Sequence, residues 1–309
     1  MTLTHHLNAF LEHRRNSRVS EGTLELYTRT LQNWSLWREE QGFDEHLHAI
    51  NHSEVHKFFR ELSKRPGRHA QFVSANTILT FYRIMRAFWS YLDHHDILIP
   101  EQRTAFARGR IPLPREPRKP RPAIDAAMID QLITSINTST EEGARDCAII
   151  FLLWESGMRV SELAQLSHEV ADLPNRRAII TGKGGKVDVV FWSKHAAYAL
   201  NRYLRMRGGA SKGPILRGIS SRNNGDGITS NLVRCMIKRR AKHAGVKLPL
   251  GAPVHGIRHG AAREMRRRGA TCEEVRDILR HESLITTRRY LGLDIEPRQS
   301  IHQRIWDTR

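Results

Sequence analysis

Six side chains that could act on a phosphodiester are spread over four short segments in the second half of the chain. In sequence order they are Arg159, Lys183, His255, Arg258, His281 and Tyr290. Two arginines can bind a phosphodiester through forked hydrogen bonds and neutralise charge on its non-bridging oxygens. A tyrosine hydroxyl can attack phosphorus and form a covalent phosphotyrosine. A histidine can take the proton of the tyrosine, and a lysine can protonate the leaving sugar oxygen. The set indicates phosphoryl transfer in which cationic side chains stabilise the transition state and no metal is needed.

Each segment also has an ordinary structural explanation when it is taken alone. Arg159 follows a glycine in ESGMRVSEL and could form a surface ion pair with Glu162. The TGKGGKV turn around Lys183 lacks the GxxxxGK[ST] pattern of a nucleotide-binding loop. His255 and His259 in HGIRH have the spacing of metal ligands, but no third ligand is in view. We therefore expect no metal and no cofactor, and it is the combination of segments that favours catalysis.

Charge and cysteine content restrict the class of partner and the compartment. The 309 residues carry a formal net charge of +18, and nucleic acid is the first candidate to balance it. An anionic membrane surface is disfavoured, because the basic residues do not form one long amphipathic helix. Three dispersed cysteines indicate a reducing compartment, and the longest apolar run, 147–154, is too short to cross a bilayer. With no secretory signal at the N-terminus, we expect a cytoplasmic protein.

The elements that must position these residues begin with a helical N-terminal region. Apolar residues recur at three- and four-residue spacing after Ser20, up to Gly42, and again after Ser74, which predicts two amphipathic helices. Their aromatic residues are expected to form a core rather than platforms for stacked bases. Residues 1–110 are therefore predicted to form a small helical domain.

A proline-rich stretch separates this region from the segments with the chemistry. PLPREPRKPRP falls within 111–123, and proline both fixes φ and removes a hydrogen-bond donor, so an extended linker is predicted. Its basic residues could follow a phosphate backbone or could be solvated. The candidates for DNA contact here are Arg118, Lys119 and Arg121.

Residues 124–309 have a mixed pattern. Apolar periodicity predicts helices over 125–136, 144–157, 229–245, 255–270 and 271–283. Two β-rich runs, 178–181 and 187–192, predict a hairpin around the GKGG turn. The expected fold class is therefore α+β, mainly α with a small β-sheet.

The basic helix predicted over 229–245 is the first choice for reading DNA. Polar and basic side chains near its start could contact base edges in the major groove, and its later basic side chains could contact phosphates. The candidates are Ser230, Asn231 and Arg234 for bases, and Lys238, Arg239 and Arg240 for phosphates.

Taken together, the four segments resemble the tyrosine recombinases, also called phage-integrase or Xer-type recombinases. SGMRVSEL is similar to the first-arginine segment of that family, and TGKGGK to its lysine hairpin. HGIRHG is similar to its H-x-L-R-H-[ST] segment, and LRHES…TTRRY to its L-G-H-[ST]…T-x-x-Y segment. The resemblance covers the whole chain and implies an N-terminal helical core-binding (SAM-like) domain before a C-terminal catalytic domain.

By this resemblance, three of the residues hold the scissile phosphate. Arg159 and Arg258 bind it directly, and His281 donates a hydrogen bond to it. Glu162 is similar to an acidic residue that supports the first arginine. The chain departs from the family pattern at three places: Gly260 stands where serine or threonine is usual, Arg280 stands where glycine is usual, and YLGLD stands where Y-x-H-[VL] is common.

The resemblance also assigns the bond-breaking steps. Tyr290 is the nucleophile that forms a 3′-phosphotyrosyl link to DNA, and His255 is the acid/base for it. Lys183 is the general acid for the leaving 5′-hydroxyl. We further expect that Tyr290 is not a packing residue and that it is held near DNA on a short mobile segment.

The implied activity is that of a DNA strand-transferase acting as a site-specific recombinase, without a metal. The partner is a duplex recombination site, on which four protomers form a tetrameric synapse, alone or with a second recombinase. The first choice is the integrase or transposase of a mobile element. A Xer-type chromosome-dimer resolvase, a type IB topoisomerase and a catalytically silent DNA-binding regulator remain open.

The tail after Tyr290 is apolar for its length. We expect it to dock onto a neighbouring protomer, and the alternative is that it caps its own domain. The apolar residues concerned are Ile295, Ile301, Ile305 and Trp306.

Overall fold

Two compact units follow each other along the chain in the computed structural model, Met1–Arg118 and Lys119–Arg309. The structure describes residues 1–67, 71–106, 111, 113–114, 123–182, 185–208, 211–219, 225–249 and 253–291. Several predictions fall outside the described residues: those on Arg118, Lys119, Arg121, Lys183, Ile295, Ile301, Ile305 and Trp306. The predicted bounds of the two domains and of the linker stay predictions.

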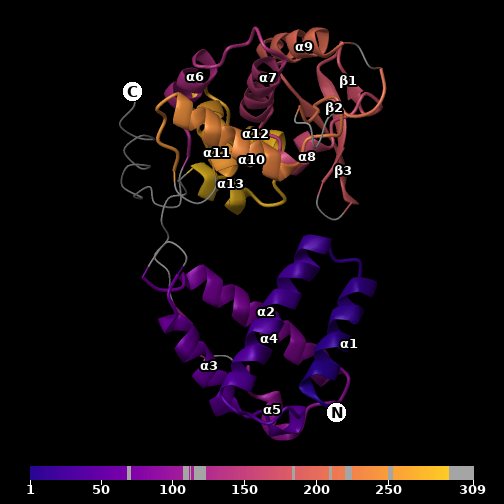
Figure 1. Cartoon of the computed structure of the whole chain (residues 1–309), viewed down its shortest axis with the longest axis vertical. Coiled ribbons are helices and arrows are strands. Elements are labelled where there is room, and N and C mark those ends of the chain that lie inside the picture. Colours follow the sequence, from indigo (N-terminus) through magenta and orange to yellow (C-terminus); the bar gives the residue numbers. More distant parts are fainter. Residues whose placement is uncertain are drawn as a thin grey trace, which may run out of the picture. The chain divides into compact units, whose positions relative to one another are not determined.

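The N-terminal unit is built from helices (Figure 1), and aromatic residues form much of its core. Its elements are α1 (Leu3–Asn16), α2 (Glu21–Glu40), a short 3-10 helix (Leu47–Ala49), α3 (His52–Lys64), α4 (Ala75–His94) and α5 (Pro100–Arg103). The hydroxyl of Ser74 accepts a hydrogen bond from the N–H of Thr77 at 3.1 Å, which is the expected start of α4. Trp34, Phe58 and Phe88 are fully buried, so these aromatic residues form the core.

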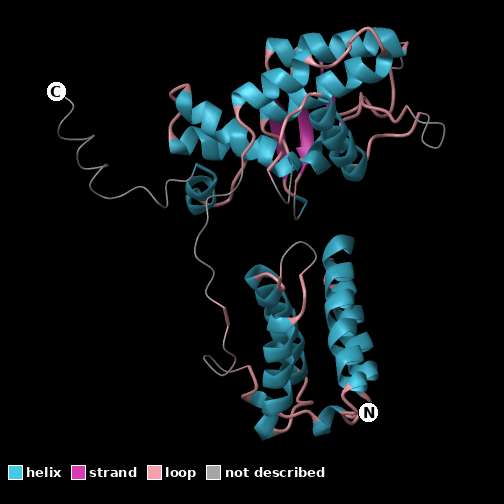
Figure 2. Ribbon diagram, turned by 60° about the vertical axis from the view of Figure 1, so that its left-hand side comes forward, coloured by secondary structure: helices cyan, strands magenta, loops and turns pink. Residues whose placement is uncertain are grey.

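The C-terminal unit places a small sheet among helices. Its elements are α6 (Ala126–Thr134), α7 (Glu141–Ser156), α8 (Val160–Ala164), β1 (Ala171–Asp172), β2 (Arg177–Thr181), β3 (Val187–Phe191), α9 (Lys194–Arg207), α10 (Ser230–His243), α11 (Pro253–Arg267), α12 (Cys272–Leu279) and α13 (Leu284–Leu291). Twelve of the sixteen residues of α7 are buried, so this helix is enclosed on nearly all sides. Figure 2 shows that the strands are confined to this unit.

The three strands form an antiparallel sheet in the order β1-β2-β3. The predicted hairpin is the β2–β3 pair, in which Ile179 lies opposite Val189. The short β1 was not predicted from the sequence. The mainly helical fold with one small sheet confirms the predicted fold class.

The five helices predicted in the C-terminal unit correspond to α6, α7, α10, α11 and α12, whereas α9 was not predicted. α7 ends at Gly157, whose φ of 61° is the left-handed conformation that glycine adopts at a helix end. α13 was not predicted as a helix. Among the described helices, none is both long enough and apolar enough to cross a membrane.

Candidate active site

Arg258 lies buried where three helices meet. It extends from α11, and its guanidinium donates from Nη1 to the carbonyl oxygen of Gly157 and from Nη2 to that of Leu279. These carbonyls are at the ends of α7 and α12, so one side chain joins three elements. Its pKa is lowered to about 10, chiefly by burial and then by the positive charge of Arg159. Arg258 therefore stays positively charged at neutral pH.

Arg159 is held by a single buried carboxylate. Arg159 precedes α8, and its N–H donates to Glu162 Oε2 at 2.7 Å while its Nη1 donates to Oε1 at 2.7 Å. The Glu162 side chain is 2% exposed and that of Arg159 is 37% exposed. Burial acts to raise the pKa of Glu162, but the backbone hydrogen bond from Arg159 and the charge of Arg280 outweigh it and lower that pKa. The carboxylate therefore stays ionised and fixes a partly exposed guanidinium.

His281 is a buried, neutral imidazole between α12 and α13. Its Nδ1 is 2.9 Å from the hydroxyl oxygen of Thr287, which is fully buried on α13. Burial lowers the pKa of His281 to about 4, and the charges of Arg258 and Arg159 act in the same direction. A neutral imidazole can donate one hydrogen bond and accept another. His281 can therefore act as a fixed hydrogen-bonding group near the two arginines.

Tyr290 is on α13 and packs against two histidines. Its ring centroid is 3.7 Å from that of His259 and 4.6 Å from that of His281. The residue is 9% exposed and belongs to a small apolar cluster with Val275 and Leu279. The expectation that Tyr290 is not a packing residue is therefore wrong, and the expectation of a mobile segment stays a prediction. The reason is that α13 folds onto α11 and α12, which was not visible in the local sequence.

The two histidines of HGIRH have different surroundings. His255 is exposed on α11, whereas His259, one turn later, is buried against Tyr290. The sequence assigned a role to His255 and considered His259 only as a metal ligand. The only sequence signal for His259 was its position directly after Arg258. Within the part of the chain that the structure describes, no group of three potential metal-binding side chains occurs.

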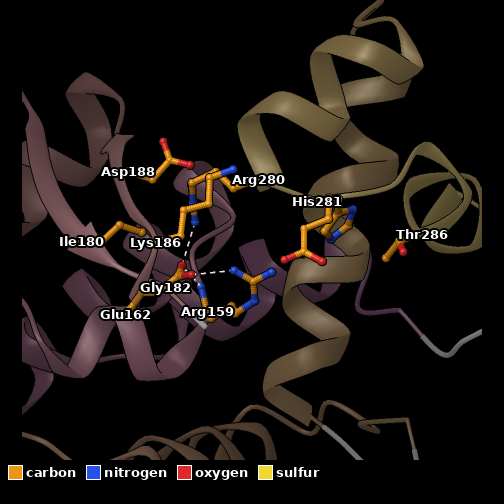
Figure 3. Close-up of a pocket in the computed structure, with 10 residues that line it drawn as sticks. Arg159, Glu162, Ile180, Gly182, Lys186, Asp188, Arg280, His281 and Thr286 are labelled. Atoms are coloured by element: carbon orange, nitrogen blue, oxygen red, sulfur yellow. Dashed lines mark hydrogen bonds and ion pairs between the residues drawn. The ribbon is translucent and has the colours of Figure 1, made fainter. Parts of the chain in front are cut away.

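A pocket opens beside Arg159 and His281, between the helices and the β-hairpin (Figure 3). Lys186 and Asp188 of the hairpin line it. Arg280 lines it from the end of α12. Lys183 is outside the described residues, but Lys186 places a lysine of the same hairpin at the site. Sequence reasoning did not single out Lys186 as a site residue, and it treated Arg280 only as a departure from the family pattern.

Three predicted DNA contacts lie on one exposed stripe of α10. Asn231, Arg234 and Lys238 are exposed, and their spacing of three and four residues puts them on one face of the helix. Ser230 is half-buried at the helix start. This stripe is open to a partner.

Two further predicted contacts, Arg239 and Arg240, are engaged within the protein. Their guanidinium groups are 3.2 Å and 2.7 Å from Oδ2 of Asp146, which is fully buried in α7. Arg145 contacts the other oxygen of the same carboxylate at 2.7 Å. Three arginines therefore neutralise one buried carboxylate, and two of them tie α10 to α7.

The glycine at position 260 has a steric reason in this chain. A Cβ atom there would lie 1.7 Å from the carbonyl oxygen of Ile124 and 2.8 Å from a ring carbon of Trp154. The N–H of Ile124 also donates to the carbonyl oxygen of Gly256 at 3.0 Å, so the chain runs directly against α11. A serine or threonine does not fit at this position.

The sequence matches a known protein family and several of its members. Residues 123–296 match the model of the Phage integrase family. Tyrosine recombinase XerC of Xanthomonas campestris pv. campestris is 27% identical over 93% of this chain and 84% of the relative. Tyrosine recombinase XerC of Pseudomonas aeruginosa is 29% identical over 96% of this chain and 93% of the relative.

Solved structures show the same fold at low identity. The Tn1549 transposon integrase, in complex with transposon right end DNA, has a TM-score of 0.75 and 16% identity over 99% of this chain and 98% of that one. The XerH site-specific recombinase, bound to a palindromic difH substrate, has a TM-score of 0.72 and 18% identity over 97% of this chain and 84% of that one.

Proposed function

The chain belongs to the phage integrase family and is a tyrosine recombinase, a DNA strand-transferase; on that premise we propose that Arg159, Arg258, His281 and Tyr290 form its cleavage site. The observation that carries this proposal is their convergence from three separate segments of the chain. Arg258 is tied to the end of α12, two residues before His281, and Tyr290 packs on His281. Arg159 lines the same pocket as His281.

The proposed reaction has one bond formed and one broken in each step. The oxygen of Tyr290 attacks the phosphorus of the scissile phosphodiester, and the bond from phosphorus to the 5′ oxygen breaks. The product is a 3′-phosphotyrosyl link and a free 5′-hydroxyl, which attacks the link of another strand in the reverse sense to rejoin DNA. The two guanidinium groups neutralise the negative charge that builds on the non-bridging oxygens.

Proton transfer is assigned to residues around the tyrosine and the hairpin. His255 is proposed to take the tyrosine proton, and Lys183 to give a proton to the leaving oxygen. Lys186, from the same hairpin as Lys183, lines the pocket, which supports a role for this hairpin at the leaving oxygen. His281, whose pKa is lowered to about 4 by burial and neighbouring charge, is proposed to hydrogen-bond the phosphate in its neutral form rather than to act as an acid.

Covalent trapping tests this proposal directly. The protein is incubated, in chelator, with duplex DNA from both ends of the region around its own gene, nicked so that the cleaved end diffuses away. We expect a protein–DNA adduct that Tyr290→Phe abolishes. Tyr198→Phe, at a tyrosine 66% exposed on α9, is the matched control and keeps the adduct. Tight binding by the wild-type protein without any adduct would contradict the proposal and favour a silent DNA-binding regulator.

We propose that the duplex partner is a recombination site of a mobile element, bound by a tetramer of this chain. An identity of only 27–29% to XerC proteins that match nearly the whole chain, together with the departures at Gly260 and Arg280, favours a chain that has diverged from chromosome resolution. The nearly full-length match to those XerC proteins keeps chromosome-dimer resolution as the second candidate. Capture of DNA from the borders of an element, rather than from one fixed chromosomal locus, separates the two.

The tetramer proposal rests on the apolar tail, 295–309, as a contact between protomers. Deleting it is expected to leave binding to a single site intact and to abolish synapsis of two sites. The measurement is native gel electrophoresis of the truncated protein with one and with two labelled sites. Unchanged recombination by the truncated chain would overturn this proposal.

A further inference from the structure

Arg280 is an arginine in a backbone conformation that suits glycine. It is the residue directly after α12, with φ of 55° and ψ of 49°, the left-handed region. A Cβ atom makes this region unfavourable, and helix ends of this kind usually have glycine or asparagine. The Arg280 side chain is only 8% exposed. Something in the surroundings must therefore offset the cost of placing an arginine here.

The contacts of Arg280 lead to the first arginine of the site. Its Nη2 donates to Glu162 Oε2 at 2.7 Å, and its Nη1 donates to the carbonyl oxygen of Ile278 at 2.8 Å. Glu162 Oε2 also accepts from the N–H of Arg159, and Oε1 accepts from Arg159 Nη1. Figure 3 shows this carboxylate between the two arginines. One buried carboxylate is therefore shared by Arg159 and Arg280.

Two arginine partners affect the protonation of Glu162 because its carboxyl group is buried. Burial favours the protonated form of a carboxyl group, and the charge of Arg280 is among the causes that keep the pKa of Glu162 low. A protonated Glu162 would accept fewer hydrogen bonds from Arg159. The side chain of Arg159 is partly exposed, so it would then be free to adopt other rotamers in the pocket.

We propose that Arg280 is a positioning residue for strand cleavage, which fixes the guanidinium of Arg159 at the scissile phosphate through the carboxylate of Glu162. The inference rests on the proposed function of the pocket. It adds to that site a residue at a position where the family resemblance leads one to expect glycine. At this position the chain has an unfavourable left-handed arginine at the end of α12, and in return Glu162 has a second positively charged partner.

The experiment compares Arg280→Gly and Arg280→Lys with the wild-type protein. The substrate is a nicked duplex with the sequence that wild-type protein captures covalently from a randomised pool. We expect Arg280→Gly to slow adduct formation by about tenfold to a hundredfold, because a misplaced guanidinium no longer meets the phosphate. Affinity for the duplex should change by less than about threefold, and the fall in melting temperature from losing the ion pair should be partly offset, because glycine fits the left-handed backbone.

The pH profile separates positioning from a purely structural role. Without Arg280, the pKa of Glu162 rises, so its protonation should begin at higher pH and move the acid limb of the cleavage rate to higher pH. Arg280→Lys restores one charge and should bring back part of the rate and the acid limb. Arg176→Gly is the control, because Arg176 is also an arginine with a positive φ, 53°. It lies in the turn between β1 and β2, and its backbone bonds to Leu173 and Trp192 rather than to residues of the pocket. It should leave rate and profile unchanged.

Three results would overturn the inference. One is an unchanged rate and pH profile in Arg280→Gly. Another is a fall in melting temperature and rate with an unmoved acid limb, which would make Arg280 a structural ion pair. The third needs no DNA: NMR of the His281 imidazole would show an unchanged pKa in Arg280→Gly, whereas we expect that pKa, about 4 and lowered partly by Arg280, to rise. If wild-type protein forms no adduct, the proposed function fails, and this titration still decides whether Arg280 acts on the pocket.

Discussion

The ring of Tyr290 lies on the imidazole of His259, with the two ring centroids 3.7 Å apart and the planes tilted by 39°. His281 meets the same ring edge-on at 4.6 Å. The ring therefore sits between a histidine of α11 and the histidine that precedes α13. Ring packing therefore helps to set the position of the proposed nucleophile.

Tyr290→Phe and Tyr290→Ala should accordingly differ in stability. Phenylalanine keeps the ring contacts, so the free energy of unfolding should change by less than about 1 kcal/mol. Alanine removes a buried ring and should cost about 3 kcal/mol or more. Urea denaturation of both variants measures the difference. Equal losses in the two variants would mean that the hydroxyl, not the ring, holds α13 in place.

His281 should make the stability depend on pH on the acid side. Its pKa is lowered from 6.5 to about 4 by burial and by neighbouring arginines, so the unfolded chain binds its proton more readily than the folded chain. Stability therefore falls as pH drops from about 6.5 to 4, by about 3 kcal/mol at most. Above pH 6.5 the contribution is constant. The measurement is urea denaturation at several pH values, with His281→Asn as comparison. The two proteins should have unfolding free energies that converge toward pH 4, and parallel curves would contradict this.

Gly260→Ala should destabilise the protein, whereas Gly22→Ala should not. Both glycines are in helices, α11 and α2. A Cβ atom at position 260 would meet the Ile124 carbonyl oxygen at 1.7 Å, and one at position 22 would meet nothing within 4 Å. We expect a loss of about 3 kcal/mol or more for the first and a gain of about 0.5–1 kcal/mol for the second. Thermal unfolding checks both. A tolerated Gly260→Ser would show that Ile124 moves away easily.

Local chemistry explains which elements could be predicted from the sequence. Ser74 marks the start of α4 because a capping hydroxyl bonds to a neighbour three residues away. Gly157 marks the end of α7 because its left-handed φ suits glycine. The spacing of Arg159, Arg258 and Tyr290 pointed to one site before the fold was known. The two helix ends could be predicted because they depend on residues close in sequence. The site could be predicted because short segments of the chain resemble those of a known family.

Other site features depend on contacts between distant segments and had no such signal. His259 and Thr287 became site residues only because α13 packs on α11. Arg280 meets Glu162 across 118 positions of the chain. The sequence predicted phosphate contacts at Arg239 and Arg240 from their charge, and the structure pairs both with a buried carboxylate on α7. Charge alone does not distinguish a partner in solution from one inside the protein.

The cluster around Asp146 gives the last prediction. Its carboxylate is fully buried and is contacted by Arg145, Arg239 and Arg240. Asp146→Asn leaves these arginines, two of them largely buried, without their negative partner. We expect a loss of about 3–5 kcal/mol, as for other buried ion pairs that lose one member.

The matched control is Glu142→Gln, because Glu142 contacts Arg239 at 2.7 Å but its side chain is 44% exposed. Exposed ion pairs contribute about 0–1 kcal/mol, so this variant should unfold nearly as the wild-type protein does. Denaturant unfolding compares the two.

Because Asp146 holds α10 to α7, its loss should also weaken binding of DNA by the exposed stripe of α10, whereas Arg234→Ala should weaken binding without loss of stability. Equal stability of Asp146→Asn and wild type would mean that solvent reaches the cluster and replaces the carboxylate.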